Sequence, residues 1–189
     1  MAKTLNPEAN FQVANAEKLP FDDNNFDGVT CNFGILHFPN PEKAMAEAYR
    51  VCKDGARYAY AIWNTPDKSP AMSFMIEAIE KHAVTKVELP EGPPFFHYSA
   101  KENSISALEK IGFKDINFKE IDAVWKMDSA KSFVEYFRDG GARTGAYLRA
   151  HPPKALENII NYIDKNIQQY KTDAGYMVPV SMIIVSGQK

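Results

Sequence analysis

Two apolar segments that flank one amphipathic helix place the strongest constraint on how this chain folds. Residues 26–33 and 57–63 are nearly continuous apolar runs, as expected of strands that are buried on both faces of a sheet. Between them, Pro41 stands where a first-turn proline is tolerated, and Asp54 and Gly55 stop the helix. The apolar stripe of this helix consists of Ala44, Met45, Ala48, Tyr49 and Cys52. The order strand, helix, strand predicts an α/β fold with a parallel sheet.

Beyond residue 64 the chain alternates between proline-rich connections and further helix and strand patterns. A helix over residues 71–83, rich in Met and Phe and bracketed by prolines, predicts a helical lid inserted into the sheet. Two late apolar segments favour an antiparallel hairpin beside the parallel core. The other expected elements are a helix end at 2–5, a short strand at 11–14, a helix capped by Ser99 or Asn103 and ended by Gly112, a strand at 116–125, helices at 129–137 and 153–170, and a strand at 176–186.

Composition and charge exclude several classes of function. Apolar residues make up 45% and charged residues 24%, which are globular values, and a net charge of −2 with both signs interspersed argues against nucleic-acid binding. No apolar run approaches the ~20 residues of a membrane helix. The first residues contain no apolar signal core, which predicts a cytoplasmic protein. Cys31 and Cys52 are interpreted as free thiols, and the four histidines lack metal-ligand spacing, so no metal is expected.

A series of short motifs occupies residues 8–63. The motifs read EKLPF at 17–21, DDNNFD at 22–27, NFGILHF at 32–38, PNPEKA at 39–44 and EAYRVCKDG at 47–55. In its order and spacing, this series resembles the third-to-fifth-strand region of class I S-adenosylmethionine-dependent methyltransferases of the ubiquinone and menaquinone biosynthesis group. After residue 64 the resemblance is limited to topology and the closing strand.

The resemblance implies a Rossmann-like sheet with the cofactor across the carboxyl ends of its first strands. In that family the first strand ends in a glycine-rich turn, and the second ends in an acidic residue that holds the ribose. Neither motif is found here, so we expect a partial, N-terminally truncated sheet that lacks its first two strands. The glycine cluster at 140–145 follows a predicted helix and is interpreted as a flexible turn. The implied organisation is a single domain, 1–189, with a remaining cofactor-side core at 1–63, a lid insert at 64–99, and a C-terminal part of the sheet at 100–189 that carries a helical insert at 129–171.

The resemblance implies that five residues contact S-adenosylmethionine. They are Asn15, Ala16, Leu19, Asn32 and Phe33. Asn15 stands where the family usually has an aspartate, and its neutral amide accepts a weaker hydrogen bond from the adenine; a plain turn asparagine is the alternative. Leu19 packs near the adenine or belongs to the core. Asn32 and Phe33 occupy the position that faces the methionine portion of the cofactor.

The methyl acceptor is expected to bind close to the loop that follows Asn32 and Phe33. His37 lies on the next loop and is either a catalytic or a structural histidine. Trp63, Phe95, His97 and Tyr98 either line an acceptor pocket or pack the lid. Because the sulfonium donor is already activated, alignment and water exclusion supply most of the catalysis, and no Ser-His-Asp or metal motif is expected. The partner is a small-molecule methyl acceptor that the sequence does not identify.

The implied loss of the first strand leaves residues 27–33 without a neighbour. Such an edge is a template for pairing, so we expect a homo-oligomer such as a dimer, a rearranged N-terminal segment, or a separate polypeptide at this edge. Two functions remain open. The chain is part of a methyltransferase and carries a partial cofactor site, or it is a non-catalytic remnant that acts as an association or binding module.

Overall fold

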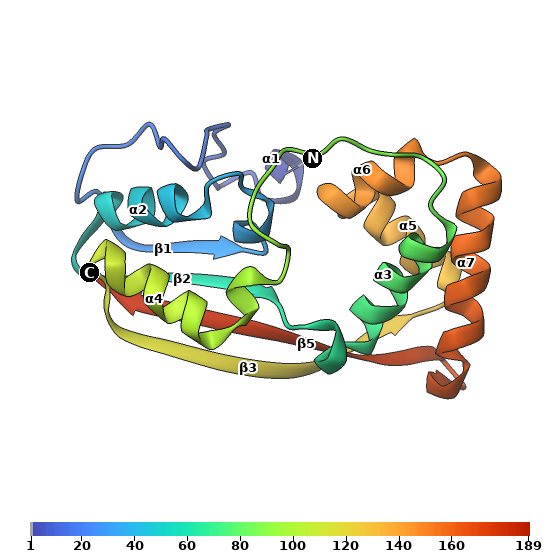
Figure 1. Ribbon diagram of the computed structural model, residues 1–189. Coiled ribbons are helices and arrows are strands. Elements are labelled where there is room, and N and C mark those ends of the chain that lie inside the picture. The colour runs from blue at the N-terminus through green and yellow to red at the C-terminus, as the bar shows by residue number, and fades with distance from the viewer. Residues whose placement is uncertain (1) are drawn as a thin grey trace.

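The computed structural model describes residues 2–189, which form a mixed sheet with helices packed against it (Figure 1). At one edge of the sheet, β1 (Phe26–Asn32) runs parallel to β2 (Cys52–Trp63). Next comes β5 (Gly175–Gln188), which is antiparallel to β2 and to β3 (Lys114–Met127), the strand at the other edge. The short β4 (Lys171–Thr172) pairs with the start of β5. The predicted α/β class, with a parallel pair followed by antiparallel late strands, is confirmed.

The helices begin and end where proline, glycine and serine favour it. In the described residues the α-helices are α1 (Ala2–Leu5), α2 (Pro41–Val51), α3 (Pro70–His82), α4 (Lys101–Ile111), α5 (Ala130–Gly140), α6 (Arg143–Ala150) and α7 (Pro153–Ile167). Prolines open α2, α3 and α7, where the missing N–H costs nothing. Gly112 ends α4 with a φ of +114°, and Ser129 forms a capping box with Ser132 at the start of α5.

Three expectations from the sequence were wrong in detail. Residues 11–14 belong to no strand of the described sheet, and their side chains are exposed, Val13 fully so. A short segment without a paired neighbour cannot satisfy its backbone as a strand does. The first residue of α4 is Lys101 and its N-cap is Ala100, not Ser99 or Asn103. The glycine cluster is only partly a turn, because α6 begins at Arg143 and continues through Gly145.

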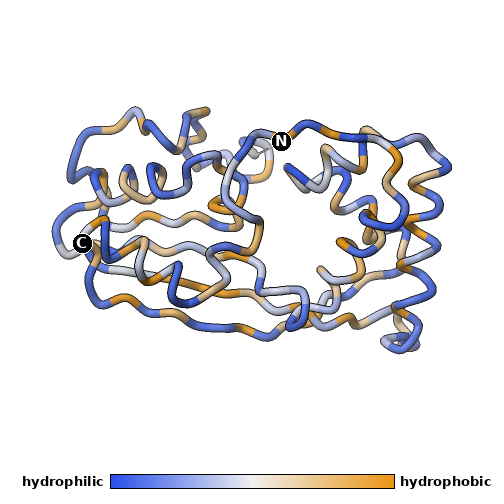
Figure 2. The backbone as a smooth tube through the Cα atoms, viewed as in Figure 1, coloured by the Kyte–Doolittle hydropathy of each residue, from blue (hydrophilic) through white to orange (hydrophobic). Residues whose placement is uncertain are grey.

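Two hydrophobic cores lie on opposite faces of the sheet and at opposite ends of it. The first core, under α2 and α4, includes Tyr60 and Ile183. The second core, under α3, α5 and α7, includes Val178 and Val180. Consecutive side chains of a strand point to opposite faces, so odd-numbered Ile183 and even-numbered Val178 and Val180 serve different cores. Figure 1 shows α2 and α4 at one end and α3, α5, α6 and α7 at the other, with β3 and β5 running between them. Along β3, hydrophobic and hydrophilic residues alternate as this arrangement requires (Figure 2).

The face of β1 and β2 opposite the first core is open in the described part of the chain. Thr30 and Asn32 are exposed on it, and Ala59 and Ala61 are half-buried beside them. Ile184, the β5 partner of Ala61, remains 37% exposed. The same end of the sheet therefore has one open face and, at β1, one open edge.

Candidate functional site

A cavity of about 420 Å³ opens at the carboxyl ends of β1 and β2. Its lining consists of Asn32, Phe33, His37, Trp63, Met72, Phe95, Trp125, Tyr136, Phe137, Gly140, Gly141, Ala142 and Thr144. The two strands are parallel, so their carboxyl ends meet at one edge, the place where open α/β sheets bind ligands. Met72 comes from α3 and Phe137 from α5, so the second group of helices closes the cavity.

Stacked aromatic rings form one wall of the cavity. The centroid of the Phe33 ring lies 4.2 Å from that of Trp63, and the Trp63 and Trp125 rings stack at 5.6 Å. Phe33 holds a φ of +52°, a left-handed conformation that a bulky residue rarely adopts. Such a conformation costs about 1–3 kcal/mol and persists where the surroundings enforce it, often at a functional site. Here it occurs immediately after β1, beside Trp63.

His37 supplies an imidazole to the other side of the cavity. It ends the short 3-10 helix Ile35–His37, and its ring lies 6.2 Å from that of Phe95. In the described part of the chain its buried Nδ1 has no hydrogen-bond partner. Burial lowers the pKa of His37 below the usual 6.5, and the charge of Arg143 acts in the same direction. The ring is therefore neutral at neutral pH, the form in which an imidazole can accept a proton.

The helix that carries His37 starts at a glycine for a steric reason. A Cβ on Gly34 would lie 2.8 Å from the sulfur of Cys31 and 3.3 Å from the ring of Phe38. Only a residue without a side chain lets the chain turn this closely out of β1. Cys31 and Cys52 are both free, and burial raises the pKa of each thiol, so neither is activated as a nucleophile.

The predicted cofactor residues occupy two places. Asn32 and Phe33 line the cavity, whereas the other three lie in the loop that precedes β1. In that loop the Oδ1 of Asn15 accepts a hydrogen bond from the backbone N–H of Glu17 at 2.9 Å, which is the geometry of an Asx turn. Ala16 packs against the first core. Leu19 is half-buried, and its N–H donates to Glu47 at 2.6 Å.

The predicted acceptor residues are also divided. His37, Trp63 and Phe95 line the cavity. His97 and Tyr98 belong to the 3-10 helix His97–Ser99, outside the residues that line it, and their rings meet edge to face at 4.8 Å. Tyr98 is buried in the first core, where its carbonyl accepts a hydrogen bond from Ser104.

Sequence reasoning missed the part of the lining that comes from α3 and from the chain after residue 124. These residues are Met72, Trp125, Tyr136, Phe137, Gly140, Gly141, Ala142 and Thr144. Gly140 and Gly141 were the available signal, because they end α5 before α6 begins and their backbone lines the cavity. Their distance in sequence from β1 concealed the connection.

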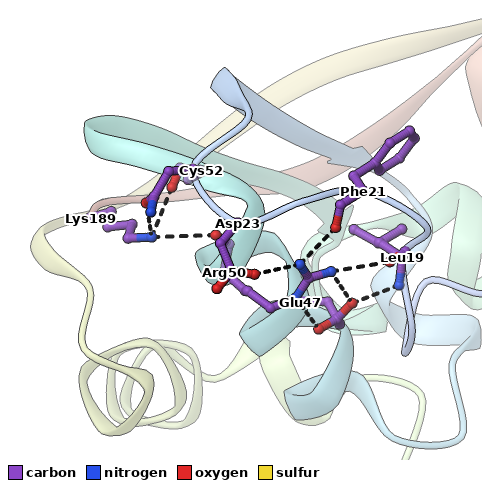
Figure 3. Close-up of polar contacts among 8 residues, drawn as sticks. Leu19, Phe21, Asp23, Glu47, Arg50, Cys52 and Lys189 are labelled. Carbon is purple, nitrogen blue, oxygen red and sulfur yellow. Dashed lines mark hydrogen bonds and ion pairs between the residues drawn. The ribbon is translucent and has the colours of Figure 1, made fainter.

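Next to the loop of Asn15, an arginine and a glutamate of α2 form a dense polar cluster (Figure 3). Arg50 contacts both oxygens of Glu47 at 2.8 Å, and its Nη1 donates to Asp23 at 2.7 Å. Hydrogen bonding from Arg50 is the main reason that the pKa of Glu47 lies below its usual 4.5, and Glu47 raises the pKa of Arg50 in return.

The lowered pKa of Glu47 predicts an acid-dependent loss of stability. A carboxyl whose pKa is lower in the folded state contributes its full stability above the unfolded value, near 4.5, and loses it as the pH falls through the folded value. Urea denaturation at a series of acidic pH values should therefore show a shallower loss of stability for Glu47→Gln than for the unmodified protein. Identical acid profiles would contradict this assignment.

The described residues offer little to a metal or a bilayer. No group of three or more His, Cys, Asp or Glu side chains among residues 2–189 is arranged to hold a metal ion. None of the described helices has the length and apolar character needed to span a membrane.

Comparisons with known proteins agree with this geometry. Residues 1–60 match the family model described as a methyltransferase domain. The ubiquinone/menaquinone biosynthesis C-methyltransferase UbiE of Brucella canis is 52% identical over 56 residues, which cover 30% of this chain and 21% of the relative. The protein of the same name from Brucella anthropi is 30% identical over 127 residues, which cover 62% of this chain and 48% of the relative. The matches thus span less than half the length of these curated relatives.

Solved structures extend the likeness to the whole fold. A putative methyltransferase from an antibiotic biosynthesis pathway of Anabaena variabilis superposes with a TM-score of 0.60 at 13% identity, over 94% of this chain and 72% of the other. The YcgJ protein of Bacillus subtilis gives a TM-score of 0.56 at 20% identity, over 100% of this chain and 75% of the other. The first third of the chain therefore matches a methyltransferase domain in sequence, and nearly the full chain shares the fold of these two solved structures.

Proposed function

We propose that this chain takes part in methyl transfer from S-adenosylmethionine to a small-molecule acceptor held in the cavity at the carboxyl end of β1. The observation that carries the proposal is the position of the cavity. It lies where open α/β sheets bind ligands, and it is lined by Asn32 and Phe33, which lie at the end of β1 within the segment that matches the methyltransferase domain model.

The proposed cofactor half-site consists of Asn15, Ala16 and Leu19 in the loop with Asn32 and Phe33 at the end of β1. Asn15 accepts from the adenine amino group with the second lone pair of its amide oxygen, because Glu17 already uses the first. Asn32 and Phe33 adjoin both the proposed methionine position and the cavity. The site is partial in this chain, since the glycine cluster of the described residues follows α5 and not a parallel strand.

The reaction is a direct displacement at the methyl carbon. S-adenosylmethionine, when bound, supplies a methyl group on a positively charged sulfur. The acceptor atom forms the new bond to carbon, the carbon–sulfur electron pair goes to sulfur, and a proton must leave the acceptor. His37, which is neutral and lines the cavity, takes that proton. The aromatic wall excludes water and aligns the acceptor, and alignment of this kind lowers barriers by up to ~7–11 kcal/mol.

Site-resolved titration tests this function. Amide resonances of the full chain are followed by NMR while S-adenosylmethionine is added, with ATP as the control nucleotide. We expect perturbations at residues 15–19 and 32–33 and none along α7. An absence of perturbation, or perturbations confined to other elements, would overturn the proposal.

We further propose that two copies of the chain associate through β1. Among the described residues, β1 pairs only with β2, and Thr30 and Asn32 are exposed along it. The N–H of Phe33 donates to Ala61 of β2 at 3.0 Å, so by alternation the N–H groups of Thr30 and Asn32 point to the free edge. An edge with unpaired N–H and C=O groups supports pairing with a second strand.

A single substitution tests this association. Thr30→Pro removes an outward N–H and adds a ring at the free edge, while the hydrogen bonds to β2 come from neighbouring residues. Light scattering should give twice the monomer mass for the unmodified chain and for Thr30→Ser, and the monomer mass for Thr30→Pro. A monomeric unmodified chain at high concentration would show that the edge does not mediate assembly.

A further inference from the structure

The loop that carries the proposed adenine contacts has little structure of its own. Between α1 and β1 the described chain contains turns and one isolated bridge, Asn15 with Lys18. Phe11 is 42% exposed, and the side chains of 12–15 are exposed as well. In Figure 1 this segment runs beside α2 and outside the sheet. Apolar burial is limited to a few positions such as Ala16, which packs against the first core, and half-buried Leu19, so polar contacts must hold the rest of the loop.

One set of contacts comes from the C-terminal turns of α2. Glu47 accepts the backbone N–H of Leu19 at 2.6 Å, and Nη2 of Arg50 donates to the carbonyl of Leu19 at 3.1 Å. Nη1 of Arg50 donates to the carbonyl of Phe21 at 2.7 Å and to Asp23. Figure 3 shows these bonds converging on one guanidinium. We call this set of residues, Leu19, Phe21, Asp23, Glu47 and Arg50, the Arg50 clamp.

A second set holds the loop at the other end of α2. The carboxylate of Glu17 accepts from the backbone N–H of Asn40 at 2.8 Å and from its side-chain amide at 3.1 Å. Asn40 is the N-cap residue of α2, where a negative charge is favourable. The loop is thus attached to both ends of an 11-residue helix, about 16 Å apart at the usual rise per residue.

The chemistry of the clamp requires an arginine. Nε and Nη2 bind the two oxygens of Glu47 side by side, which leaves Nη1 and the remaining Nη2 hydrogen for the two loop carbonyls. A lysine has one nitrogen and cannot reproduce this planar fork. The side chains of Arg50 and Glu47 are only 31% and 19% exposed, so solvent screens the pair less than it would an open surface pair.

We propose that Arg50 is a positioning residue for the cofactor half-site. This proposal rests on the proposed function. Arg50 holds Asn15, Ala16 and Leu19 against α2 before the cofactor binds, and it does not touch the cofactor. Leu19 is the link, because the clamp binds both of its backbone polar groups. Loss of the clamp loosens the loop, which Glu17 still attaches to Asn40, and leaves the two hydrophobic cores in place, since neither contains Arg50.

Hydrogen exchange of the full chain tests the clamp directly. In Arg50→Met, the amides of residues 16–23 should exchange at least about tenfold faster. A hydrogen bond to a charged group contributes enough free energy to suppress local opening by that factor or more. Amides of β2 and α4 should not change. Arg50→Lys should resemble Arg50→Met, since charge alone does not rebuild the fork. Arg138→Met is the matched control, because it removes an exposed Arg–Asp pair on α5.

Titration with S-adenosylmethionine separates positioning from simple loop attachment. We expect the concentration needed for half-maximal perturbation at residues 15–19 to rise about tenfold or more in Arg50→Met and to stay the same in Arg138→Met. Unchanged exchange in Arg50→Met would overturn the clamp. Faster exchange with unchanged titration would leave a structural attachment and overturn the positioning role. No perturbation in the unmodified chain would overturn the proposed function itself, and with it the positioning role.

Discussion

Replacement of His37 by phenylalanine is expected to lower the rate of methyl transfer by about two to four powers of ten, the usual contribution of a positioned proton acceptor. The substitution keeps an aromatic ring beside Phe95 and removes the nitrogen that has no partner in the described chain. Stability should change little, because no hydrogen bond of the imidazole is lost. The measurement is transfer of a labelled methyl group in a reaction that contains every polypeptide needed for turnover.

The pH profile distinguishes a proton acceptor from a ring that only shapes the cavity. A base is active in its neutral form, and the lowered pKa of His37 keeps it neutral below the usual 6.5. We therefore expect the rate to stay level through pH 6.5 and to fall at lower pH, and we expect this fall to be absent in His37→Phe. His82→Phe is the matched control and should leave the rate unchanged, since the His82 ring lies against Tyr162 and neither residue lines the cavity. A His37→Phe variant with the full rate would refute the assignment.

Replacement of Phe133 by alanine is expected to cost about 3–5 kcal/mol of folding free energy, the range for a large aromatic removed from a core. Phe133 is 1% exposed in the second core, and its ring packs edge to face against Trp125 at 5.2 Å and against Phe137 at 5.0 Å. Both neighbours line the candidate ligand cavity. The void left by Phe133→Ala therefore also removes packing support from this part of the cavity wall. Urea denaturation followed by circular dichroism measures the loss.

The same helix provides the control. Tyr136 also meets Trp125 at 5.2 Å, yet it is 64% exposed, so Tyr136→Ala should cost less than about 1 kcal/mol. Equal losses for the two variants would mean that α5 does not pack as described. Because Tyr136 lines the cavity mouth, its variant is also suited to measuring acceptor contacts in a stable background.

The fold was largely predictable because local patterns and long-range packing agree in it. The proline at the start of α2 and the glycine at the end of α4 mark helix ends without reference to the rest of the chain. The strand expected at 11–14 failed for the opposite reason. A strand needs a neighbouring strand to pair with. The alternation of apolar and polar side chains does not show whether such a partner strand is present. The position of β5 inside the sheet likewise depends on pairing with β2, which no local pattern encodes.

The candidate site was predictable only where it follows the chain closely. Asn32, Phe33 and His37 lie within six residues of one another, and one motif was enough to bring them together. Trp125 and Thr144 line the same cavity from β3 and α6. Their approach to β1 depends on tertiary packing, which the sequence pattern does not show. The role of Arg50 was equally hidden, since its partners at Leu19 and Phe21 are backbone groups and leave no signature in residue type.

Trp63 and Phe95 pack against both hydrophobic cores and also line the cavity. The cavity therefore lies at the seam between two bodies that share the long strands β3 and β5. A molecule seated there touches both bodies at once. The size of the binding space is therefore set by how the second group of helices packs against Trp63 and Phe95.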